Sequence, residues 1–268
     1  MQVTEDTFLK LAAQVPSIEQ LLSGSLEILR DAIRSAAAEG EPTRWMVLHI
    51  VLGSALRLRA LNAPEDDRVQ MYTEALRAFE TALTACCEQK LRHVREPLPA
   101  AARVGVSSHR EVHAGSDGVQ LVVDATGLSG AEGNELLERA VRVFRDACSR
   151  ARRRMEFDEW FIGMSNLGCA LTLLGCRTPG IAGIPLLEEA VDVFQQALQS
   201  AARERLLDER ASAQANLSEA LQALAERGIP SESVRYLEQA VDWRAAALSH
   251  FAPAEYRWIL QLNRVRPC

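Results

Sequence analysis

Residues 136–144, LLERAVRVF, decide the fold, because the same pattern returns elsewhere in the chain. Fifty residues later, residues 186–194 read LLEEAVDVF, and after another fifty, residues 236–244 read YLEQAVDWR. Looser copies stand at 71–79 and 21–33. The apolar residues of each copy recur at i, i+3, i+4 and i+7, which is the period of a helix with one buried face. The sequence therefore predicts five copies of one helix type, which we call the B helix.

A second helix type, which we call the A helix, precedes several of these copies. The segment NLGCAL at 166–171 returns as NLSEAL at 216–221. The segment LGSAL at 52–56 lies 115 residues before LGCAL at 167–171. The B copies at 71 and 186 are related by the same shift of 115 residues. Glycine and proline between the A and B segments are helix stop and start signals. We therefore expect an all-α fold of helix–turn–helix units in series.

These residues resemble the tetratricopeptide repeat family, whose pattern is W-x2-L-G-x2-Y followed by A-x3-F-x2-A. Residues 164–171 with 190–197, and 49–56 with 75–82, keep that spacing, and 140–147 match its second half. The unit near residue 210 departs from the pattern, with Ser218 at the glycine position and Arg244 at the phenylalanine position. The period of fifty is longer than the usual one of about 34. It is similar to the long arrays of bacterial multidomain signalling proteins.

The resemblance covers roughly residues 20–265 and implies a right-handed α–α superhelix of about five helix–turn–helix units. Residues 1–268 would form a single domain, closed by a capping helix and tail at 251–268 that packs on the B helix near residue 236. Small residues such as Gly168 and Ala190 stand where paired helices approach closely. Phe194 would fill the junction to the next unit.

An irregular insertion at about 96–133 interrupts the array, because the B copies at 71 and 136 are sixty-five residues apart without a clean A helix between them. Three structures are compatible with it: a mobile loop, an irregular A helix with a loop, or a small hairpin turning at GSDG, 115–118. His109 and His113 are four residues apart and could share a metal on a helix. No third ligand is fixed nearby, so we expect solvated histidines, no metal and no cofactor.

The candidate binding site follows from the resemblance, since the A helices of this family line a concave groove. Asn166 and Asn216 share one frame, and the resemblance implies that their amides grip the backbone of a bound peptide. The expected neighbours on this face are Ser165, Cys169, Thr172, Ser212, Glu219, Gln222, Ser54 and Arg57. The alternative is that both asparagines bond to neighbouring helices inside the core.

Composition and charge narrow the class of protein. The chain is 48% hydrophobic with a net charge of −6, which argues against disorder and makes nucleic acid an unexpected partner. We read no signal peptide and no membrane span, and six scattered cysteines fit thiols in the cytoplasm. Four arginines at 150 and 152–154 could meet an acidic partner, but cations also complement the dipole of a helix C-terminus.

The sequence therefore favours a non-catalytic adaptor that binds a peptide or helix of a partner protein in the groove. No nucleophile elbow, phosphate loop or zinc-protease motif is present. One alternative is an enzyme or small-molecule binder with 96–133 as a lid and His109, His113, Asp117 or Asp124 as acid or base. Another is a self-assembling scaffold that pairs through an exposed segment at 251–262.

Overall fold

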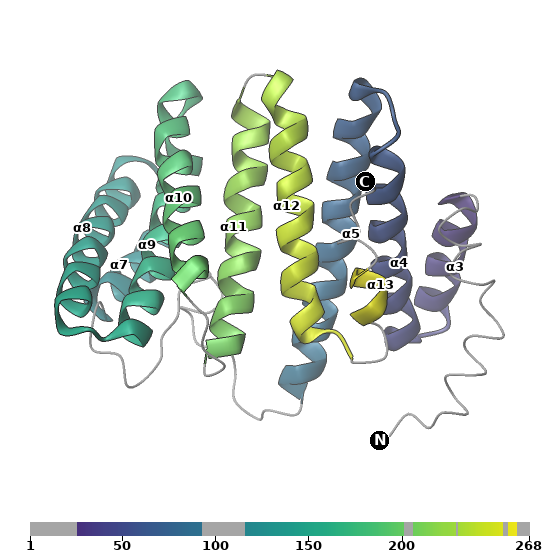
Figure 1. Ribbon diagram of the computed structural model, residues 1–268, viewed down its shortest axis with the longest axis horizontal. Helices are drawn as coiled ribbons and strands as arrows, with labels where there is room; N and C mark the ends of the chain where they lie inside the picture. The colour runs from purple at the N-terminus through teal and green to yellow at the C-terminus, as the bar shows by residue number, and fades with distance from the viewer. Residues whose placement is uncertain (1–25, 93–115, 201–205, 229, 254–256, 262–268) are drawn as a thin grey trace. The chain divides into compact units, whose positions relative to one another are not determined.

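The computed structural model describes residues 26–92, 116–200, 206–228, 230–253 and 257–261, and these are helical without a strand among them (Figure 1). The helices are α3 Leu26–Ala38, α4 Pro42–Ala60, α5 Glu65–Arg92, α7 Ser116–Thr126, α8 Gly130–Arg154, α9 Phe157–Arg177, η1 Gly180–Gly183, α10 Ile184–Ser200, α11 Leu207–Arg227, α12 Pro230–Phe251 and α13 Arg257–Gln261. The all-α prediction is confirmed, and the packing of these helices is consistent with helical repeats.

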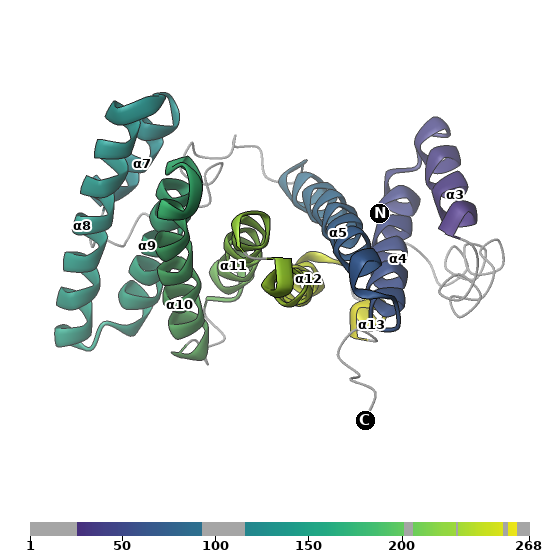
Figure 2. The same ribbon diagram turned by 90° about the horizontal axis from the view of Figure 1, so that it is seen from above.

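The chain divides into two compact units, Met1–His93 with Phe251–Cys268, and Val94–His250. In the first, α4 packs against both α3 and α5 (Figure 2). In the second, α7 packs on α8, α8 on α9, α9 on α10 and α10 on α11. The predicted B helices are α3, α5, α8, α10 and α12, and the A helices include α4, α9 and α11. The prediction that residues 1–268 form a single domain stays a prediction.

In two of the helix pairs a glycine of the A helix lies against a phenylalanine ring of the B helix. A Cβ atom at Gly53 would lie 2.6 Å from the ring of Phe79, and one at Gly168 would lie 2.6 Å from the ring of Phe194. Both rings are fully buried. In each pair the phenylalanine follows the glycine by 26 residues. Phe194 therefore packs within its own helix pair, and its predicted place at the junction to the next unit stays a prediction.

A third copy of this contact reveals an A helix inside the expected insertion. A Cβ atom at Gly118 of α7 would lie 2.7 Å from the ring of Phe144 on α8. The hairpin predicted at 115–118 is wrong, as is the absence of a clean A helix, because residues 116–126 are helical. Val122 and Ala125 are buried there, so tertiary packing overrides the β propensity of the valine run. Residues 96–115, with His109 and His113, lie outside the described residues.

Successive helix pairs are joined by polar contacts that also repeat. Arg145 of α8 contacts Glu189 of α10 at 2.5 Å, and 115 residues earlier Arg30 of α3 contacts Glu74 of α5 at 2.6 Å. Such part-exposed ion pairs contribute about 0–1 kcal/mol, so they define helix register more than stability. The pairs α3 with α5 and α8 with α10 are thus joined at equivalent positions.

The C-terminal segment is represented by α13, which packs against α4. Ile259 and Leu260 are buried in this contact. The sequence predicted contact with the helix near residue 236, whereas the described contact is with α4. Burial of these two side chains also removes them from the exposed surface on which the self-assembly alternative depended.

Gly168→Ala is expected to lower the free energy of unfolding by about 1–3 kcal/mol, because the added methyl group overpacks a buried ring that has no room to move. Chemical denaturation measures this. Gly163→Ala, in the same helix, is the control, since its Cβ atom would meet no ring and only Cys148, at 3.0 Å from Sγ and 4.0 Å from the backbone nitrogen. Equal stability of the two variants would contradict the close contact between α9 and α10.

Met155→Gly is expected to raise the free energy of unfolding by about 1 kcal/mol, because Met155 holds a left-handed conformation with φ 60°. Its side chain is 67% exposed, so little packing is lost. Gly40 occupies the equivalent turn 115 residues earlier, with φ 69°. Met155→Ala keeps the strained backbone and is the control. A thermal melt that shows the same gain for both variants would contradict backbone strain as the cause.

Candidate functional site

Five of the predicted groove residues lie in the core. They are Ser54 and Arg57 on α4 and Ser165, Asn166 and Cys169 on α9, and Asn166 is only 2% exposed. The Ser165 hydroxyl donates to the carbonyl oxygen of Phe161 at 3.0 Å. These five are therefore corrected from groove residues to interior ones, because the central turns of α4 and α9 are covered on all sides.

The predicted residues on α11 are accessible instead. Ser212 and Glu219 are exposed, whereas Asn216 and Gln222 are half-buried. Gln222 donates from Nε2 to Oε1 of Glu226 at 3.2 Å. Thr172 of α9 is half-buried, and its hydroxyl donates to the carbonyl oxygen of Gly168 at 2.9 Å. Within the described residues, the predicted face is thus most open along α11.

The open side of α11 carries a line of acidic and polar residues. At 100° per residue, Asp208, Ser212, Glu219 and Glu226 fall within about 40° of one another around the helix axis. All four are exposed. Three carboxylates stand on this line, which we call the α11 acidic stripe, and no lysine or arginine interrupts it. The stripe is therefore a negatively charged surface.

Neighbouring side chains partly hold the stripe in place. His250 Nε2 of α12 lies 2.7 Å from Oδ1 of Asp208, and Arg244 Nη2 of α12 lies 3.7 Å from Oε1 of Glu219. The Glu219 side chain nevertheless keeps 56% of its surface exposed. The carboxylates are thus positioned by α12 while they remain available to a ligand.

Asn216 makes a contact within the protein, as the second interpretation of the sequence had it. Its Nδ2 donates to Sγ of Cys169 on α9 at 3.0 Å. Burial raises the pKa of the Cys169 thiol, Glu219 raises it further, and the hydrogen bond from Asn216 opposes both. The thiol is therefore protonated near neutral pH and unsuited to nucleophilic catalysis.

A buried arginine replaces the phenylalanine in the last helix pair. Ser218 and Arg244 are 26 residues apart, like the three glycine–phenylalanine pairs, and Arg244 Nε donates to the Ser218 hydroxyl at 3.3 Å. Ser218 donates in turn to the carbonyl oxygen of Ala240 at 2.8 Å. Arg244 is only 3% exposed. The sequence showed both departures separately, and the constant spacing of 26 could have shown that they form one contact.

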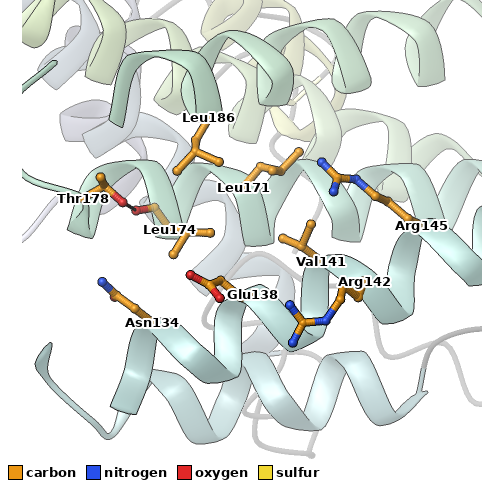
Figure 3. Close-up of a pocket in the computed structure, with 9 residues that line it drawn as sticks. All are labelled: Asn134, Glu138, Val141, Arg142, Arg145, Leu171, Leu174, Thr178 and Leu186. Carbon is orange, nitrogen blue, oxygen red and sulfur yellow. Dashed lines mark hydrogen bonds between the residues drawn. The ribbon is translucent and has the colours of Figure 1, made fainter. Parts of the chain in front are cut away.

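Sequence reasoning missed a pocket between α8, α9 and α10, with a volume of about 390 Å³ (Figure 3). Leu171 and Leu174 of α9 supply apolar wall, and Leu186 of α10 lies across from α8 (Figure 3). Its other lining residues are Asn134, Glu138, Val141, Arg142, Arg145 and Thr178. No motif marks the pocket, because its lining comes from three helices spread over about fifty residues of sequence.

Metal and thiol chemistry find little support within the described ranges. No group of three or more His, Cys, Asp or Glu side chains there is placed to hold a metal ion. Burial raises the pKa of the Cys86 and Cys148 thiols to about 12.

None of the described helices has the length and apolar character needed to cross a membrane.

No protein-family model, curated protein or solved structure matches this chain. The tetratricopeptide resemblance therefore rests on the residue spacing described above.

The double variant Ser218→Gly/Arg244→Phe is expected to raise the free energy of unfolding by about 1–3 kcal/mol. Replacement of a buried charge by a well-packed apolar group of similar size is often stabilising, and the same contact already exists in three other pairs. Arg244→Ala alone is expected to destabilise, since it leaves a cavity. Urea titration measures the free energy of unfolding of both variants. A double variant less stable than the wild type would show that arginine packs better at this position than a phenylalanine ring.

Proposed function

We propose that this chain is a non-catalytic protein-binding module, a right-handed superhelix of tetratricopeptide-like helix pairs that holds a segment of a partner protein against its A helices. Two features support this proposal. The glycine–phenylalanine contact occurs in three pairs, and the ion pair between successive B helices occurs in two places. Repeats that contact mainly their neighbours build large surfaces for partner proteins.

The observation that carries the proposal is the α11 acidic stripe. A line of exposed carboxylates with Ser212 between them complements a segment that carries lysine, arginine or exposed backbone N–H groups. It does not complement a carboxylate-bearing tail, which needs basic side chains. The partner proposed here is therefore a basic segment of another protein.

A cytoplasmic location is part of the proposal. The described cysteines are thiols rather than disulfides, which fits a reducing compartment.

The variant Ser212→Lys/Glu226→Lys is expected to lose the partner, because it removes the net negative charge of the stripe without touching the contacts of Arg244. Its matched control is Ser149→Lys/Glu188→Lys, since Ser149 of α8 and Glu188 of α10 are also exposed. Crosslinking pull-downs from the source cell, quantified by mass spectrometry, compare both with the wild type. Circular dichroism melts establish that all three chains are folded.

A partner retained by the wild type and the control but lost by the stripe variant would support the proposal, as would weaker capture at high salt. A partner retained equally by both variants would remove the stripe as the binding surface. Absence of any specific partner of the wild type would overturn the protein-binding function itself.

A further inference from the structure

We propose that the α11 acidic stripe of one copy of this chain binds an arginine-rich face of α8 on a second copy. This face consists of exposed side chains that fall within about 80° of one another around the axis of α8, namely Arg139, Arg142, Arg150 and Arg153. We call it the α8 arginine face. The inference rests on the function proposed above, because it uses the same stripe, and it names the partner that supplies the basic surface.

The α8 arginine face carries charge that the described part of the chain does not neutralise. No ion pair among the described residues involves any of its four side chains. Asp146 is the one carboxylate between residues 139 and 153, so the face has an excess of three positive charges. The three carboxylates of the α11 acidic stripe form an equal excess of negative charge. The two surfaces are therefore complementary in sign and in amount.

Neither the repeat nor the helix dipole accounts for these arginines. A shift of fifty residues takes Arg139 to Glu189 and Arg142 to Asp192 in α10, so a B helix does not require arginine at these positions. Cations complement the dipole only within the last turn of a helix, whereas Arg139 and Arg142 precede the end of α8 at Arg154 by three turns or more. Like charges on adjacent turns also repel one another. An acidic surface outside the chain explains why they are present.

The stripe and the face carry their charges at the same interval. Asp208 and Glu219 are 11 residues apart in α11, and Arg139 and Arg150 are 11 residues apart in α8. At 1.5 Å per residue each interval is about 16 Å, and 11 residues return to nearly the same side of a helix. The other two arginines of the face repeat this interval. A second copy of α8 laid along α11 can therefore bring two arginines to two carboxylates at once.

The contact has to form between two copies of the chain. Within one copy, α8 packs on α9, α9 on α10 and α10 on α11, so α9 and α10 separate the two surfaces (Figure 2). The side chains of Asp208 and Glu219 remain 61% and 56% exposed, so a second copy can reach them. Exposed ion pairs are individually weak and are screened by salt, which makes the association dependent on ionic strength.

Sedimentation velocity of the full chain at rising concentration measures this self-association. In low salt the sedimentation coefficient is expected to rise with concentration. In about 1 M salt, where the screening length falls to about 3 Å, it is expected to stay at the value of a single chain. A wild type that sediments as a single chain at every concentration in low salt would overturn the proposal, and so would association that high salt leaves unchanged.

Two charge variants locate the contact. The α8 variant, Arg139→Glu/Arg150→Glu, removes the excess positive charge of the α8 arginine face. The stripe variant, Ser212→Lys/Glu226→Lys, removes the net negative charge of the stripe. Each is expected to sediment as a single chain in low salt. Either variant associating as strongly as the wild type would overturn the proposal.

The matched control for the α8 variant is Arg34→Glu/Arg77→Glu. It changes the net charge of the chain by the same amount, at exposed arginines of α3 and α5. It is expected to associate like the wild type. Loss of association in this control would overturn the assignment to α8, since the total charge would then be responsible. Circular dichroism melts establish that all variants are folded.

A mixture of the two charge variants tests whether the two surfaces bind each other. The α8 variant keeps its acidic stripe, and the stripe variant keeps its α8 arginine face. An equimolar mixture is therefore expected to form a 1:1 complex in low salt, although neither variant associates alone. A mixture that sediments only as single chains would overturn the proposal.

The same measurements distinguish other partners. A wild type that stays a single chain, and cosediments with RNA or with anionic phospholipid vesicles unless the α8 variant is used, would assign the face to that anion and overturn the inference. A single-chain wild type whose cellular partner is lost by the stripe variant would also overturn the inference, but it would leave the function proposed above in place.

Discussion

The contact of a phenylalanine ring with a glycine backbone is the constraint on which the helix pairs depend. At Gly53, Gly118 and Gly168 any side chain would lie within 2.7 Å of a buried ring. The close approach of the two helices at that point therefore requires a residue without a side chain. Close-packed interiors leave no slack for an alternative arrangement. Once such a pair is fixed, the faces that it turns toward neighbouring helices are fixed as well, including the face of α9 that lines the pocket.

The last pair breaks this constraint in a coordinated way. Ser218 and Arg244 change together, and the longer arginine side chain extends from the interior toward Glu219 at the surface. The aliphatic stem of an arginine can pack where a ring would, while its charged end needs partners. The exchange links the core of α11 and α12 to the stripe on α11. In this described pair, Arg244 contacts both Ser218 in the interior and the exposed carboxylate of Glu219.

The repeats share some side-chain contacts and differ at other positions. The Arg145–Glu189 and Arg30–Glu74 ion pairs keep their place across a shift of 115 residues, whereas Leu186 and Tyr236 occupy one frame with different volumes. Positions that define register are thus shared between units. Other positions on the B helices vary, as the leucine at 186 and the tyrosine at 236 show. An array built from similar units can in this way carry distinct binding surfaces without a change of fold.

The sequence by itself determined the helical class, the two helix types, their spacing and most of the small and large interior positions. These follow from periodicity, which reports the apolar face of each helix. It could not determine which neighbour covers that face. Gly118 looked like part of a turn because only its contact with Phe144 shows why a glycine stands there. Asn166 and Asn216 share one frame, yet the first is buried and the second is half-buried. Burial depends on the helices packed around a residue, and only the tertiary structure decided that.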